Sequence, residues 1–96
     1  MEEATDGTGA AASFKFPYGT TTDGTNLYVA DTGNNTVRKI VIATGVVTTL
    51  AGTAGVTGST DGTGAAASFN RPGGITTDGT NLYVADTGNN TVRKIQ

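Results

Sequence analysis

The stretch TTDGTNLYVADTGNNTVRKI at Thr76–Ile95 decides the fold, and the same letters occur at Thr21–Ile40. Its apolar runs are rich in β-branched and aromatic residues, and polar residues interrupt them with the alternation typical of half-buried strands. Asp-Gly and Asn-Asn lie between the runs, and both favour tight turns. The stretch therefore predicts strands at Leu82–Ala85 and Thr91–Ile95, preceded by a shorter strand at Gly74–Thr77.

The chain is a tandem repeat with a period of 55 residues, because TDGTGAAASF at Thr5–Phe14 returns at Thr60–Phe69. Such near-identity implies recent duplication or deliberate construction. A period of this length indicates supersecondary units that must stack on neighbours to bury their apolar faces. We therefore divide the chain into a first repeat at 1–55 and a second repeat at 56–96. Only four of the 36 positions from Thr5 to Ile40 differ between the copies, namely Lys15/Asn70, Phe16/Arg71, Tyr18/Gly73 and Thr20/Ile75.

The first repeat carries one more predicted strand than the second. Its third strand is expected to continue through Ala43, and Val46–Leu50 predicts a fourth strand that closes a four-stranded antiparallel meander. The second repeat has no counterpart of Val41–Leu50 in this sequence, so its third strand is expected to be an exposed edge. Met1–Ala4 is too short and too polar to replace the fourth strand. The sequence thus predicts an all-β fold with seven strands.

The run LYVADTGNNTVRKI, preceded by Pro72–Ile75 and followed in the first repeat by VVTTLAG, resembles an NHL repeat. The resemblance covers nearly the whole chain. It implies β-propeller blades, with the Gly-Ile-Thr strand innermost and the VVTTL strand outermost. Two blades do not close a ring, so we expect the ring to be completed by homo-oligomerisation. A homotrimer or a homotetramer would give six or eight blades.

The connection from Ala51 to Arg71 contains Ala65–Ala67, for which one helical turn and an irregular loop both remain open. Phe14 and Phe69 flank the corresponding segments of the two repeats, and we interpret both as anchors of these connections.

Composition excludes several classes of function. Eight acidic and six basic residues give a net charge of −2, which has the wrong sign for a nucleic-acid-binding surface. The sequence has no cysteine and no histidine, which removes disulfides, thiolate metal sites and the commonest general base. It also shows neither a signal peptide nor an apolar run that could span a bilayer. We expect no cofactor, no nucleic-acid or membrane partner, and a cytoplasmic location.

Asp31 and Asp86 each begin an Asp-Thr-Gly turn, a tripeptide that resembles the catalytic tripeptide of aspartic proteases. The flanking strands do not fit that class, and an aspartate that begins a turn ordinarily accepts backbone hydrogen bonds. Asp23 and Asp78 also recur with the repeat, but calcium needs six or more convergent oxygens, which one copy does not supply. We therefore predict no catalytic, cofactor-binding or metal-binding residue, and the chain should not be an enzyme.

The pairs Arg38-Lys39 and Arg93-Lys94 place their members on opposite strand faces, so they do not form one basic patch. We expect a solvated strand edge with local pairing to aspartate. The sequons Asn34–Thr36 and Asn89–Thr91 are interpreted as turn chemistry.

These observations favour a non-catalytic, self-assembling β-propeller scaffold, as an engineered protein or an evolutionary model would be. The alternative is a ligand- or protein-binding propeller module, in which turns around a central channel present the site and the ligand is unknown.

Overall fold

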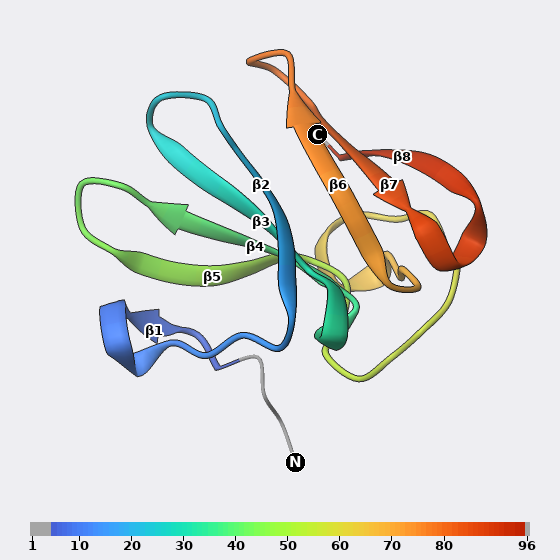
Figure 1. Cartoon of the computed structure of the whole chain (residues 1–96), viewed down its shortest axis with the longest axis horizontal. Coiled ribbons are helices and arrows are strands. Elements are labelled where there is room, and N and C mark those ends of the chain that lie inside the picture. The colour runs from blue at the N-terminus through green and yellow to red at the C-terminus, as the bar shows by residue number, and fades with distance from the viewer. Residues whose placement is uncertain (1–4, 96) are drawn as a thin grey trace.

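The computed structural model describes residues 5–95 and contains two antiparallel sheets, one from each repeat (Figure 1). The strand order is β1-β5-β4-β3-β2 in the first sheet and β6-β7-β8 in the second. The all-β fold of antiparallel meanders is therefore confirmed, whereas the expectation for Met1–Ala4 lies outside the described residues. The strands are β1 (Gly7–Thr8), β2 (Pro17–Thr22), β3 (Asn26–Asp31), β4 (Thr36–Val41), β5 (Val46–Ala51), β6 (Pro72–Thr77), β7 (Leu82–Asp86) and β8 (Thr91–Ile95).

The predicted strands are present, with two differences in the first sheet. The third strand, β4, ends at Val41 rather than at Ala43, because the next residues turn and the Gly45 amide donates to the Val41 carbonyl oxygen at 2.7 Å. The first sheet has five strands rather than four, because Gly7–Thr8 pairs with the outer strand β5.

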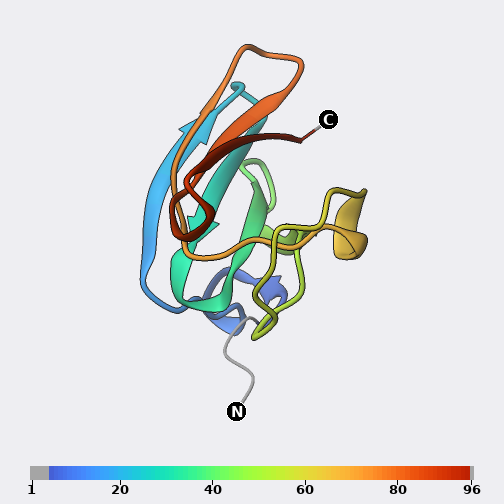
Figure 2. The ribbon, with the colours of Figure 1, turned by 90° about the vertical axis from the view of Figure 1, so that its right-hand side faces the viewer.

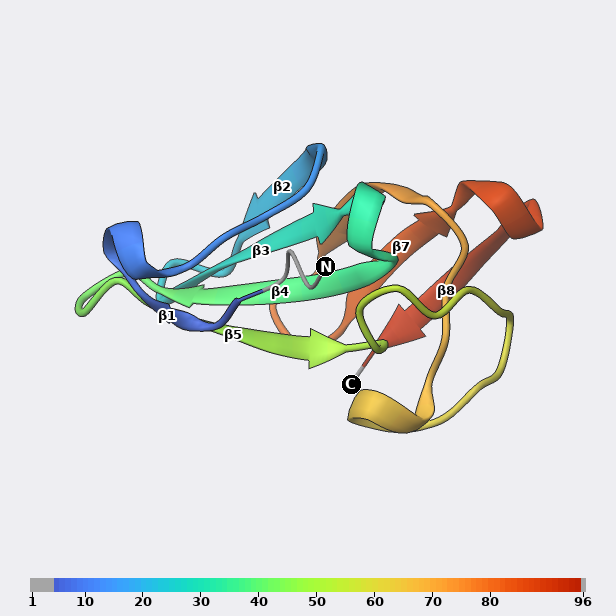
Figure 3. The same cartoon turned by 90° about the horizontal axis from the view of Figure 1, so that it is seen from below.

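Short 3-10 turns complete the described chain. They are η1 (Gly9–Ala11), η2 (Thr32–Asn34), η3 (Gly64–Ala66) and η4 (Thr87–Asn89). Turn η3 settles the alternative for the alanine run in favour of a single helical turn. Figure 3 shows the linker leaving the end of β5 and forming η3, in gold, before it returns to β6. No helix among residues 5–95 is long and apolar enough to cross a membrane.

The hairpin between β2 and β3 follows from its turn residues. Gly24 has a φ of +93°, a conformation that glycine adopts at little cost. One carboxylate oxygen of Asp23 accepts from the amides of Thr25 at 2.9 Å and Asn26 at 2.8 Å. The same geometry recurs around Asp78 in the second repeat. The Asp-Gly signal in the sequence therefore predicted the turn correctly.

The hydrophobic core lies between the two sheets. The inner strands β2 and β6 lie side by side, and the two sheets diverge from them like neighbouring blades (Figures 1 and 2). Phe69 is the largest apolar side chain of this core and is only 1% exposed, so it anchors the linker as the sequence predicted. Both repeats supply the buried cluster, which comprises Val37, Ala51, Ala67, Phe69, Leu82 and Val84.

Replacing Phe69 with alanine should destabilise the chain by about 3–5 kcal/mol, because the substitution removes buried area and leaves a cavity between the sheets. Urea unfolding followed by circular dichroism measures the loss. Phe69→Leu keeps most of the apolar volume and is the control, with a smaller expected loss. Equal losses for the two variants would contradict the assignment of Phe69 to the shared core.

Candidate functional site

Arg38 is the centre of a polar cluster in the first repeat, although its side chain is fully buried. Its Nη1 donates to the carboxylate of Asp31 at 3.1 Å and to the Ser13 carbonyl oxygen at 2.7 Å. Its Nη2 donates to the carboxylate of Asp6 at 3.1 Å and to the Thr5 carbonyl oxygen at 3.0 Å. The guanidinium also lies 4.7 Å above the centre of the Phe14 ring. We call this arrangement the arginine clamp.

The second repeat builds the same arginine clamp around Arg93. This residue pairs with the carboxylates of Asp86 at 2.8 Å and Asp61 at 2.9 Å, and it lies 4.9 Å above the Phe69 ring. Pairing of the arginines with aspartate was predicted. The expectation of a solvated strand edge is wrong for Arg38, which is fully buried on an inner strand, whereas β8 is an edge strand on which the Arg93 side chain is 11% exposed. Strand alternation suggested a solvated edge because it does not show which face of a strand is covered by a distant segment, such as the one that carries Asp6.

Asp31 and Asp86 have the structural role that the sequence predicted. One oxygen of Asp31 accepts from the Lys15 amide at 2.8 Å, and the other accepts from the Asn34 side-chain amide at 2.7 Å and from Arg38. Asp86 binds the Asn70 amide and Asn89 in the same way. The first asparagine of each sequon, Asn34 or Asn89, thus donates its side-chain amide to the aspartate that begins the turn. Within residues 5–95, no group of three or more acidic side chains is placed to hold a metal ion.

Asp23 and Asp78 lie in exposed hairpin turns, apart from the clamps. Hydrogen bonds from the Asn26 and Thr25 amides lower the pKa of Asp23 below its usual value, and the Tyr28 hydroxyl adds to the effect. Amides of Asn81 and Thr80 lower the pKa of Asp78 for the same reason. The pKa values fall because hydrogen bonds to the charged form of a carboxylate favour that form. Both carboxylates therefore accept hydrogen bonds within their own turns.

Equivalent residues of the two repeats differ in burial, because the second repeat packs on one face of the first. Val37 on β4 is fully buried, whereas Val92, its identical counterpart on β8, is 74% exposed. The loop Ser68–Pro72 of the second repeat lies against the first repeat, and Pro72 is buried while its counterpart Pro17 is exposed. The second repeat therefore presents an uncovered face like the one that the first repeat buries.

Specific hydrogen bonds fix the contact between the repeats. The Asn35 side-chain oxygen accepts from the Arg71 amide at 2.7 Å, and the Thr32 hydroxyl donates to the Pro72 carbonyl oxygen at 2.6 Å. The inner strands approach so closely that a Cβ on Gly19 would lie 2.5 Å from the Gly73 carbonyl oxygen. At Gly74, the counterpart of Gly19, the nearest atom to such a Cβ is 3.9 Å away.

A hollow of about 540 Å³ lies where the two inner strands begin. Phe16 and Tyr18 on its rim are 76% and 80% exposed, and Arg71 and Gly73 are their counterparts in the second repeat. Two of the four positions that differ between the repeats thus lie at this hollow. The sequence shows these differences, but both positions precede the predicted strand at Gly74–Thr77 and its counterpart, so the sequence carried no signal that they lie together.

Comparison with known sequences shows what the chain is similar to. The sequence profile of the NHL repeat matches residues 69–95. The chain is 39% identical over 92 residues to NHL repeat-containing protein 2 of Homo sapiens, a match that covers 92% of this chain and 13% of that protein. It is 38% identical over 93 residues to Protein SUPPRESSOR OF QUENCHING 1, chloroplastic, of Arabidopsis thaliana, covering 94% and 9%. The chain thus spans a small part of these relatives.

Solved structures of two bacterial proteins also align with the chain. A structural genomics protein of unknown function from Bacteroides thetaiotaomicron aligns with a TM-score of 0.90 at 34% identity, over 98% of this chain and 24% of that one. An auxiliary nutrient binding protein from the same organism aligns with a TM-score of 0.83 at 26% identity, over 98% of this chain and 26% of that one.

Asp31→Asn should destabilise the chain by about 3–5 kcal/mol, because it leaves the buried charge of Arg38 without its buried partner. Asp6→Asn is the matched control, since Asp6 contacts the same guanidinium but is partly exposed. Its expected loss is about 1 kcal/mol or less. Chemical denaturation of both variants measures the difference. Equal losses would show that the clamp does not depend on its buried ion pair.

Proposed function

Because this chain belongs to the NHL-repeat family of β-propeller proteins, we propose that it is a non-catalytic scaffold whose copies pack blade against blade to complete a ring. The observation that carries the proposal is the unequal burial of Val37 and Val92, two residues in identical sequence contexts. An apolar side chain left exposed on a face that is otherwise built for contact favours association.

The contact between the repeats supplies a template for the contact between chains. In such an interface, the leading loop of one copy, Phe14–Pro17, lies on the β8 face of the next. Asn90 binds the Phe16 amide as Asn35 binds the Arg71 amide, and Thr87 binds the Pro17 carbonyl as Thr32 binds that of Pro72. In Figure 1 the blue segment that leads into β2 lies apart from the red strand β8.

This interface is heterologous, because different surfaces of the two copies meet. Heterologous contacts generate closed rings when the rotation per subunit fits a whole number of copies. Three or four copies would give rings of six or eight blades. The non-catalytic part of the proposal is supported by the carboxylates, since Asp31 and Asp86 are buried in ion pairs with arginine and Asp23 and Asp78 hold their own turns.

Native mass spectrometry should find the parent chain as one trimeric or tetrameric species. Val92→Asp should shift it to monomer at the same concentration, because a charge would be buried without a partner in the interface. Ile42→Asp introduces the same charge at an exposed hairpin turn and should leave the assembly intact. A folded, cooperative monomer of the parent chain would contradict the proposal.

A second candidate function is ligand binding at the hollow beside Phe16 and Tyr18. Exposed aromatic rings next to an arginine suit ligands that combine a flat apolar face with polar groups. One of the similar solved structures is described as a nutrient binding protein, which favours a small nutrient as the ligand class. Divergence between the repeats at this hollow is what a site with its own specificity would require.

Calorimetric titration with a panel of small carbohydrates and peptides tests this candidate. Saturable binding is expected, and Tyr18→Ala should weaken it by about ten-fold, equivalent to about 1.4 kcal/mol, through loss of the ring contact. Val56→Ala, an apolar truncation in the exposed linker, is the control and should leave the affinity unchanged. If no member of the panel shows saturable binding, the scaffold remains the only proposed function.

A further inference from the structure

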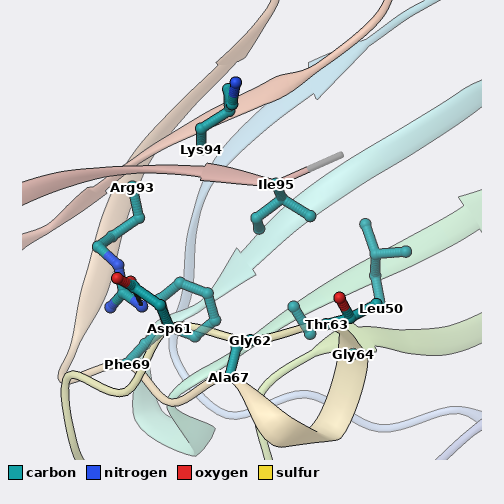
Figure 4. A pocket seen from close by; sticks show the side chains of 11 residues that line it. Leu50, Asp61, Gly62, Thr63, Gly64, Ala67, Phe69, Arg93, Lys94 and Ile95 are labelled. Carbon is teal, nitrogen blue, oxygen red and sulfur yellow. Dashed lines mark hydrogen bonds and ion pairs between the residues drawn. The ribbon is translucent and has the colours of Figure 1, made fainter.

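Arg71 differs from the other two arginines because its side chain has no partner among residues 5–95. Arg38 and Arg93 are paired with aspartates in their clamps, and Figure 4 shows Arg93 beside Asp61 and Phe69. Arg71 is exposed, and its bond to the first repeat uses only its backbone amide. The N–H donors of its guanidinium are therefore available to a ligand.

The backbone around Arg71 is held in place on both sides. The Asn70 amide donates to Asp86 at 2.8 Å, and the Gly88 amide donates to the Asn70 carbonyl oxygen at 2.7 Å. The Arg71 amide itself donates to Asn35 at 2.7 Å. These contacts keep Arg71 at a φ of 55°, which a residue other than glycine adopts only where its surroundings impose it. The direction in which the Arg71 side chain leaves the backbone is therefore fixed.

Arg71 lines the hollow of about 540 Å³ at which the two inner strands begin. The lining residues come from 16–32 in the first repeat and from 71–88 in the second, so the hollow is built at the junction that both repeats form. The first repeat supplies the exposed rings of Phe16 and Tyr18, and the second supplies the charge of Arg71. The two repeats thus contribute different chemical groups to one site.

Sequence divergence between the repeats is confined to the segments that form this hollow. All four differing positions lie within Lys15–Thr20 and its counterpart Asn70–Ile75. Gly73 replaces Tyr18, and a Cβ on Gly73 would lie 3.1 Å from the Thr87 hydroxyl oxygen. A tyrosine at this position would press on Thr87 and fill the space. The glycine therefore keeps the hollow open beside Arg71.

The charge of Arg71 is not compensated within the hollow. Among residues 5–95, Arg71 is the only charged residue that lines it. The Thr87 hydroxyl makes only a long contact of 3.4 Å with the Ala85 carbonyl oxygen, so it remains able to bind a ligand. A guanidinium binds a carboxylate through two parallel hydrogen bonds, and the face of a tyrosine ring packs on a flat apolar surface. The hollow therefore favours a ligand that carries both groups.

We propose that the hollow binds a ring compound that carries a carboxylate, with the carboxylate on the Arg71 guanidinium and the face of the ring on Tyr18. A sugar acid and an aromatic acid share this chemistry. The inference rests on the second candidate function, ligand binding at the hollow, and adds the charge of the ligand and the residue that selects it. Arg71 distinguishes the acid from a neutral analogue, whereas Tyr18 contacts the ring of both.

Chemical-shift titration of the full chain by NMR, which measures millimolar affinities, tests the charge requirement with two matched pairs. Glucuronate is compared with glucose, and benzoate with benzyl alcohol, because each pair exchanges a carboxylate for a hydroxymethyl group on the same ring. In at least one pair the acid should bind about ten-fold more tightly than the alcohol. The pair that shows this preference identifies the ligand as a sugar acid or an aromatic acid. The amides of Gly73 and Gly74 should shift, since both residues line the hollow.

Three variants assign the preference to its residue. Arg71→Gln should abolish the preference for the acid and leave the affinity for the alcohol unchanged, because only the charge-assisted contact is lost. Lys39→Gln removes one positive charge from β4, outside the lining of the hollow, and should keep the ten-fold preference as the matched control. Tyr18→Ala should weaken the acid and the alcohol by the same factor, because both lose the contact with the ring.

Ligand binding and selection by charge fail in different ways. If no ligand of either pair shifts the Gly73 and Gly74 amides to saturation, neither class binds at the hollow and the proposal is overturned together with its premise. If the alcohol binds as tightly as the acid, ligand binding stands and selection by charge is overturned. The same holds if Arg71→Gln keeps the preference or if Lys39→Gln abolishes it equally.

Discussion

The fold depends on one clamp arginine in each repeat, of which Arg38 is fully buried and Arg93 is 11% exposed. Burying a charged group costs on the order of several kcal/mol unless the group is paired and hydrogen-bonded. Arg38 meets this condition by joining Asp31 on its own blade to the carbonyl oxygens of Thr5 and Ser13, which lie up to 33 residues earlier in the chain. The segment between them is rich in glycine and alanine and has little apolar area of its own to bury. The clamp therefore supplies a polar anchor beside the phenylalanine ring, and the planar fork of arginine suits several acceptors at once.

The clamp carboxylates also hold a strained backbone. Phe16 and Arg71 have φ values of 50° and 55°, although each precedes a proline and neither is glycine. This conformation costs about 1–3 kcal/mol and persists only where the surroundings impose it. Asp31 binds the Lys15 amide just before Phe16, and the Gly33 amide binds the Lys15 carbonyl oxygen at 2.8 Å. The same contacts hold Asn70 beside Arg71. Strain and ion pairing together therefore direct these two side chains toward the hollow.

The sequence predicted the strands because each carries its own local signal, as Asp23 and Gly24 do for the first hairpin. It did not predict β1, since Gly7–Thr8 has little strand propensity and pairs with β5 where the clamp holds the adjacent Thr5 and Asp6. Burial of Arg38 was missed for the same reason, as its partner Asp6 lies 32 residues away. The difference between Val37 and Val92 is beyond any local pattern, because the two residues have identical neighbours in sequence. In the candidate site, the turn roles of Asp31 and Asp86 were predictable, whereas the hollow required the two inner strands to be brought together.

A tandem array buries the leading loop of each repeat on the face of the repeat before it. Within residues 5–95, the β8 face carries no such loop, and Val92 on that face is exposed. The edge of β8 is a separate consequence, because it involves backbone groups rather than the side chains of a face. Faces select partners by side-chain shape and by hydrogen bonds such as that of Asn35 to Arg71, whereas edges select them by register and alternation. The proposed contact between copies therefore depends on the side chains of the β8 face and not on pairing at the backbone edge of β8.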